Sequence, residues 1–148
     1  MELNTFGALL KFALELEDAA ARFYEEGVKA ARDEALRSGF AARVEWAKKN
    51  RQRLERVRRE QVNEMLLESV EGLRESDYRA GGDASPGAAD RELTASAAEL
   101  ESVCERFYRD AAERLSIPEV VRSFQRLADA HARSRAQLGG AQQTSLSD

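Results

Sequence analysis

The sequence has 148 residues, of which 43% are hydrophobic and 34% charged, and its formal net charge at pH 7 is −4. This length suits a single folded domain, and the charge is too mild to indicate general binding to nucleic acid. With one cysteine, one histidine and two prolines, the chain excludes an internal disulfide, a cysteine zinc knuckle, a site needing two imidazoles and a turn-rich β-sandwich.

The first predicted element is a long amphipathic helix. Apolar side chains recur every three or four residues over 6–31, which is the pattern of a helix with one buried face. Asn4 or Thr5 can cap its start through a side-chain oxygen.

A second helix is predicted to follow at once, capped by Asp33. No proline interrupts its apolar stripe before Tyr78, so we expect this helix to approach ~40 residues. Its far part, residues 62–70, would then overhang the shorter neighbouring helices with apolar side chains. Such an exposed apolar stripe favours a homodimer.

Residues 76–89 are predicted to link the two halves of the chain, because 80–87 is the one clear cluster of helix breakers. Asp90 is predicted to cap a third helix, and Ser116-Ile-Pro-Glu119 should end that helix and open a fourth. Gly139-Gly140 should end the fourth helix, which leaves residues 139–148 as a flexible tail.

The two halves form an internal repeat. A shift of 84 residues aligns them without a gap, with ten identities over the 42 positions from Ala13 to Leu54. The matching motifs are Leu16-Glu17 with Leu100-Glu101, and Arg22-Phe23-Tyr24 with Arg106-Phe107-Tyr108. Two similar helical hairpins, about 6–75 and 90–138, predict an all-α four-helix bundle over residues 1–138.

Several polar side chains fall on the buried stripes of these helices. Glu17 shares a helix face with Ala13, Ala20 and Tyr24, and Glu101 does the same with Ala97, Cys104 and Tyr108. Buried carboxylates are costly unless they are paired, protonated or bound to a cation. The polar residues expected inside the bundle are Glu17, Glu101, Asn50 and His131, with Tyr24 and Tyr108 close by.

These motifs resemble the ferritin-like superfamily, and especially its rubrerythrin-type members. The resemblance rests on the two Leu-Glu…Phe-Tyr motifs and on Ile117 to Ala128, and it spans about residues 6–138. It implies a four-helix bundle that holds two iron ions in active members. In that family the first and third helices each supply one Glu, seven residues before a Tyr, while the second and fourth each supply Glu-x-x-His.

The chain keeps only part of that ligand set. Glu17 and Glu101 match the single Glu positions, but the two Glu-x-x-His positions read Ala47-Lys-Lys-Asn50 and His131-Ala-Arg-Ser134. A bridged di-iron centre normally needs around six protein ligands. We therefore expect a degenerate ferritin-like protein that acts as a structural or protein-interaction bundle.

The alternative function is a metal-binding protein or oxidoreductase with an altered site. Glu17, Glu101 and His131 could hold a single Fe, Mn or Zn ion, and Asn50 could add an oxygen ligand. Without a metal, the same side chains would form a hydrogen-bonded polar core. In the metal-binding alternative, Tyr24 and Tyr108 would contact the carboxylate ligands from outside the metal site. In the metal-free core, they would be aromatic side chains whose hydroxyl groups need a buried acceptor.

Two further features have a plain and a functional interpretation. Cys104 is expected to be a small buried side chain rather than a ligand, and the basic run from Lys48 to Arg59 a solvated helix face rather than a surface for an anionic partner. Arg51 lies near the inner stripe and could neutralise one of the buried acids, and Arg135 could do so in the other half.

The predicted environment is the cytoplasm. No apolar run reaches the ~18 residues of a membrane span, and charged residues interrupt the apolar stretch near the N-terminus. Expected partners are a second copy of the chain or another protein, and neither a membrane nor nucleic acid is favoured.

Overall fold

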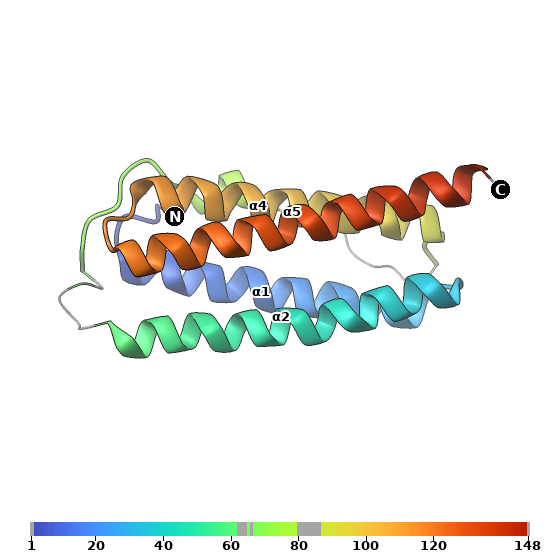
Figure 1. Ribbon diagram of the computed structural model, residues 1–148, viewed down its shortest axis with the longest axis horizontal. Coiled ribbons are helices and arrows are strands. Elements are labelled where there is room, and N and C mark those ends of the chain that lie inside the picture. Colours follow the sequence, from blue (N-terminus) through green and yellow to red (C-terminus); the bar gives the residue numbers. More distant parts are fainter. Residues whose placement is uncertain (1, 62–64, 66, 80–86, 148) are drawn as a thin grey trace.

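The computed structural model describes residues 2–61, 65, 67–79 and 87–147, with side chains as far as residue 139. It contains four long helices and one short 3-10 helix. These are α1 (Phe6–Ala30), α2 (Glu34–Glu60), η1 (Glu75–Tyr78), α4 (Asp90–Arg114) and α5 (Pro118–Ser147). The helices lie side by side in one bundle (Figure 1), which confirms the predicted all-α fold.

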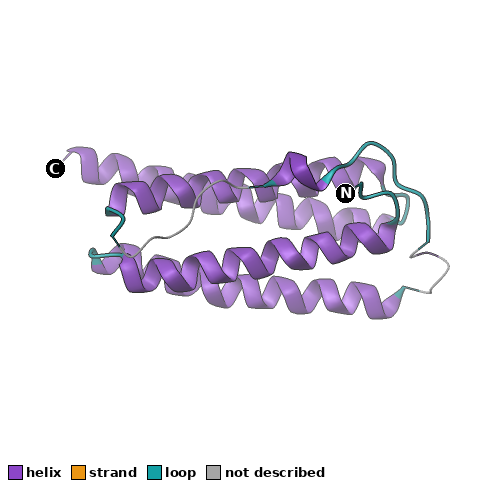
Figure 2. Ribbon diagram, turned by 180° about the vertical axis from the view of Figure 1, so that it is seen from behind, coloured by secondary structure: helices purple, strands orange, loops and turns teal. Residues whose placement is uncertain are grey.

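The bundle consists of two helical hairpins, α1 with α2 and α4 with α5. α2 ends beside the start of α1, whereas α4 begins at the opposite end of the bundle, so the link between the hairpins returns along its whole length (Figures 1 and 2). The link carries η1, where Tyr78 donates a 2.6 Å hydrogen bond to Asp110 of α4. This long crossover makes the predicted arrangement of two repeated hairpins possible.

Capping side chains fix where the first two helices begin. Thr5 accepts a hydrogen bond from the Ala8 amide at the start of α1, and Asp33 accepts one from the Leu36 amide at the start of α2. Asp90 does not cap its own helix as predicted. Its two carboxylate oxygens instead accept from the Arg32 and Asp33 amides, at 2.9 and 2.8 Å, and so join the hairpins.

The prediction of a second helix of ~40 residues was wrong, because α2 ends at Glu60. Val70 and Leu73 are buried instead in an extended segment that pairs with the N-terminal residues. Backbone hydrogen bonds join this segment to the chain on both sides of Asn4, among them Val70 N to Asn4 O at 3.0 Å. A helix continuing past the bundle would have left these apolar side chains in water.

The predicted end of the last helix at Gly139-Gly140 was also wrong, since α5 continues to Ser147. Glycine inside a helix costs only about 1 kcal/mol relative to alanine, and no proline follows to block the next turn.

Of the predicted overhang at 62–70, residues 62–64 and 66 lie outside the described part. Met65 and Leu67 are exposed, at 41% and 75%.

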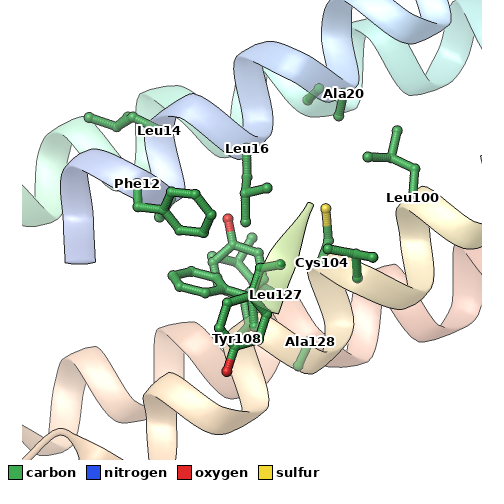
Figure 3. Packing of buried hydrophobic residues seen from close by; sticks show 14 of the residues in the cluster. Phe12, Leu14, Leu16, Ala20, Leu100, Cys104, Tyr108, Leu127 and Ala128 are labelled. Carbon is green, nitrogen blue, oxygen red and sulfur yellow. The ribbon is translucent and has the colours of Figure 1, made fainter. Parts of the chain in front are cut away.

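The core runs along the seam between the hairpins. Phe12 of α1 meets Phe107 of α4 edge to face, with ring centroids 5.1 Å apart. Further along, Leu16 of α1 points toward α4, and Cys104 of α4 points toward α1 (Figure 3). None of the described helices combines the length and the apolar character needed to span a membrane.

Candidate functional site

The buried polar residues predicted from the sequence meet at the centre of the bundle. Glu17 and Tyr24 come from α1, and Glu101 and Tyr108 come from the equivalent positions of α4. Tyr24 donates to Glu101 at 2.5 Å, and Tyr108 donates to Glu17 at 2.7 Å. Each hairpin therefore supplies the hydroxyl donor for the other hairpin's carboxylate, which is the reciprocity expected of a repeated motif.

His131 of α5 lies between the two carboxylates. Its Nδ1 is 2.7 Å from Glu101 Oε2, and its Nε2 is 3.1 Å from Glu17 Oε1. Both nitrogens face acceptors, so both must carry a hydrogen to make these bonds. Burial alone would lower the pKa of His131, but the charge of Glu17 and the hydrogen bonds to both carboxylates outweigh it and raise the pKa to about 10. The ring is therefore an imidazolium at pH 7.

Aromatic rings cover the imidazolium. Tyr108 stacks on the His131 ring, with ring centroids 5.5 Å apart and planes at 15°. Trp46 of α2 also lies against the His131 ring, with centroids 4.6 Å apart. Sequence reasoning missed Trp46, because its position next to the inward-facing Ala47 does not by itself show that a large side chain reaches across the bundle. Electron-rich rings favour a neighbouring cation.

Asn50 of α2 completes the cluster. It is fully buried, and its Nδ2 donates to Glu17 Oε2 over a long 3.4 Å. Its Oδ1 has no hydrogen-bond partner among the described residues. Asn50 thus touches a predicted metal ligand, but its contact with Glu17 is made through a donor rather than through the oxygen that could have bound a metal.

Ser134 stands at the histidine position of the second Glu-x-x-His motif. Its side chain is also engaged in a contact within the protein. Arg43 of α2 donates from Nε to the Ser134 hydroxyl at 2.8 Å and from Nη2 to the Ser134 carbonyl at 3.1 Å. The same guanidinium lies over the Tyr24 ring, 6.0 Å from its centroid. Where the resemblance places a histidine ligand, the chain has an interhelical clamp.

The residues present do not fit a pair of metal ions. Ala47 has no donor atom, Ser134 is held by Arg43, and both nitrogens of His131 are committed to carboxylates. Among the residues that the structure describes, no group of three or more His, Cys, Asp and Glu side chains is arranged to hold a metal ion.

The hypothesis that Arg51 neutralises a buried acid was wrong. Arg51 donates from Nε to Asp18 at 2.7 Å and also pairs with Glu55, and all three side chains are partly exposed. Arg135 pairs with Glu105 at 2.6 Å. Both guanidinium groups sit one position beyond the inner face of their helix, so they reach surface acids of the neighbouring helix rather than the cluster.

Cys104 lies in the same interior and is fully buried. Burial, together with the charges of Glu17 and Glu101, raises the pKa of its thiol well above the usual value. The thiol is therefore protonated and unreactive, which agrees with its predicted role as a small buried side chain.

Protonation of His131 predicts a pH-dependent stability. Because its folded pKa of about 10 lies above the ordinary 6.5, its contribution is full below about pH 6.5 and is lost as the pH rises through 10. We expect the free energy of unfolding, measured by urea titration, to fall between pH 7 and 10. The fall should be much smaller in His131→Gln, which keeps Cys104 and the tyrosines. An equal fall in the free energy of unfolding in the wild type and in His131→Gln would contradict the assignment of an imidazolium to His131.

The two acids are expected to respond differently to amide substitution. Glu17→Gln removes surplus negative charge, and a half-turn of the Asn50 amide would let its unpartnered Oδ1 accept from the new amide group, so stability should be unchanged or higher. Glu101 accepts short bonds on both oxygens, so Glu101→Gln should cost about 1.5–3 kcal/mol. Urea titration at pH 7 compares the two variants, and equal losses would contradict this description of the cluster.

Comparisons with known proteins give one consistent result. The family model described as "Ferritin-like domain" matches residues 7–144. The chain is also similar to the crystal structure of a "putative ferritin-like diiron-carboxylate protein" from Thermotoga maritima. The similarity has a TM-score of 0.82 at 14% sequence identity and covers 95% of this chain and 96% of the other. No curated protein sequence matches the chain.

Proposed function

The chain belongs to the ferritin-like domain family, and from this premise we propose that it is a degenerate member that works without a di-iron centre. Its role would be that of a structural or protein-interaction bundle. The observation that carries this proposal is the position of His131, whose two ring nitrogens are 2.7 and 3.1 Å from Glu101 and Glu17. A side chain that donates to both carboxylates competes directly with any metal for their oxygens.

The position of the other inward-facing residues supports the same proposal. A dinuclear carboxylate centre needs a Glu-x-x-His pair on each of two helices. Here those positions are Ala47 with Asn50 and His131 with Ser134, and the side chains that could bind a metal are already engaged in hydrogen bonds within the protein.

Metal analysis tests the proposal. Protein produced in medium supplemented with iron, manganese and zinc, and purified without a histidine tag, should hold fewer than about 0.1 metal ions per chain. Elemental analysis by mass spectrometry gives this ratio directly. A stoichiometric metal would overturn the proposal, and its loss in His131→Ala would locate that metal in the cluster.

The second candidate is a protein with a single Fe, Mn or Zn ion on Glu17, Glu101 and His131. The convergence of these three side chains in one buried cluster favours it, although the described side chains are not arranged to hold a metal ion as they stand. Binding would require the imidazolium to lose a proton and to give up one of its two carboxylate contacts. A stoichiometric ion in the metal analysis selects this candidate, and its absence selects the metal-free bundle.

A homodimer remains a prediction. The overhanging helix that was expected to supply the interface does not form, because α2 ends at Glu60. Met65 and Leu67 still expose apolar surface beyond that end, and such surface favours a protein partner. Sedimentation equilibrium of the wild type and of Leu67→Lys tests this: a dimer that weakens in the variant supports the prediction, and a monomeric wild type rejects it.

A further inference from the structure

The cluster contains a cation of its own. Two carboxylates that repel each other lie in the buried centre of the bundle, and Glu17, Glu101 and His131 are all at most 1% exposed. Two buried acids without a counter-charge are strongly destabilising. In the ferritin-like arrangement implied by the sequence, the metal ions provide that counter-charge.

We propose that protonated His131 is the built-in counter-ion of this bundle, so that one proton-carrying side chain replaces the metal ions as the link between the two hairpins. The inference rests on the proposed function, since it assumes that the wild type binds no metal at this site. It goes further by assigning to His131 the role that the metal ions would have, which is to balance the charge of the two acids and to join the hairpins.

The hydrogen bonds around the cluster support this assignment. The imidazolium joins Glu17 of the first hairpin to Glu101 of the second, at 3.1 and 2.7 Å. Each of the four carboxylate oxygens accepts at least one hydrogen bond, from His131, Tyr24, Tyr108 or Asn50. A centre that lacked the imidazolium would leave Glu101 Oε2 without a donor.

The two halves of the internal repeat differ at the position of His131, which lies beside the two acids. Its equivalent in the first hairpin, 84 residues earlier, is Ala47, whose side chain carries no polar atom. Trp46 and Tyr108 cover the ring. One imidazolium therefore serves both acids, and the pseudo-symmetric second cation is absent among the residues described at this site.

A double-mutant cycle tests the proposal. His131→Gln is compared in the wild-type background and in the Glu17→Gln/Glu101→Gln background, which has no charge for the ring to balance. If His131 is the counter-ion, its loss should lower Tm by roughly 10 °C or more in the first background and by no more than a few degrees in the second. Equal losses would mean that the ring acts only by packing, and would overturn the proposal.

A second variant keeps the proposal falsifiable if His131→Gln does not fold. His131→Glu places a third acid in the cluster, and it should be destabilised in EDTA. Added Mn²⁺ or Zn²⁺ should raise its Tm by several degrees or more, because a metal would again supply the missing charge. The wild type should show the same Tm in EDTA and in either metal. A variant that is insensitive to metal, or a wild type that is stabilised equally, would overturn the proposal.

The outcomes distinguish a failure of the counter-ion role of His131 from a failure of the metal-free bundle. Stoichiometric metal in the wild type would reject the metal-free bundle, and the counter-ion role with it. A metal-free wild type whose stability is the same with and without His131 would leave the metal-free bundle intact and reject only the counter-ion role.

Discussion

Restoring the four lost ligand positions is expected to make the chain bind about two divalent metal ions, against fewer than about 0.1 in the wild type. The substitutions are Ala47→Glu, Asn50→His, His131→Glu and Ser134→His. All four positions are buried on the inner faces of α2 and α5, where they surround the two remaining acids. Elemental analysis and the Tm with and without EDTA measure the effect.

The control is the same variant with His131 retained. If the imidazolium excludes metal, this triple variant should bind much less metal than the fourfold variant, although it gains a glutamate and two histidines. Equal loading of the two proteins would show that His131 does not compete for the site. A fourfold variant that folds and stays metal-free would contradict the family assignment of the ligand positions.

Gly27→Val is expected to destabilise the fold by about 3 kcal/mol or more. A β-carbon at Gly27 would lie 2.6 Å from Cδ2 and 2.9 Å from Cε2 of Phe40. The Phe40 ring is fully buried, and its centroid lies 5.4 Å from that of the Tyr24 ring. Because it is packed on this side, the Phe40 ring has little freedom to move. Because Tyr24 donates to Glu101, displacement of this ring should also disturb the cluster.

Gly39→Val is the matched control for this prediction. Gly39 also lies inside a helix, but its added β-carbon would meet only the end of the flexible Arg43 side chain, at 3.2 Å. Both variants place the same β-branched residue in a helix, so the difference between their urea midpoints isolates the clash with Phe40. Similar losses at the two positions would contradict the close packing of α1 on α2.

The bundle could be predicted because helices are encoded locally. The apolar stripes, the Thr5 and Asp33 caps and the internal repeat each depend on residues near one another in sequence. The end of α2 could not be predicted in the same way. It depends on Val70 and Leu73 finding a buried place beside the N-terminal residues, which is a contact between distant parts of the chain.

The membership of the cluster was also predictable, whereas its bonding was not. Periodicity placed Glu17, Glu101, Asn50 and His131 on inner faces, and all four are buried. Which atoms meet depends on the relative position of the helices along the bundle axis. That position brings His131 between the acids and turns Arg51 outward to Asp18, and neither outcome follows from one helix alone.

In the proposed metal-free bundle, the positions that carry metal ligands in the family hold a balance of charges instead of a ligand set. Two acids occupy the single-Glu positions, a histidine stands where a glutamate ligand is expected, and the last ligand position is part of an Arg43–Ser134 clamp. A buried charged cluster can be retained for the specificity it gives to packing, even where apolar residues would be as stable.

Nitrogen NMR of the single histidine shows whether the His131 ring carries hydrogens on both nitrogens and binds no metal. In tag-free protein the ring nitrogens of His131 give the only imidazole signals. We expect both nitrogens to be protonated at pH 7, with signals unchanged by EDTA or by added Zn²⁺ and Mn²⁺. A ring with one unprotonated nitrogen, or a nitrogen signal that shifts or broadens stoichiometrically with metal, would contradict a built-in counter-ion at the centre of this bundle.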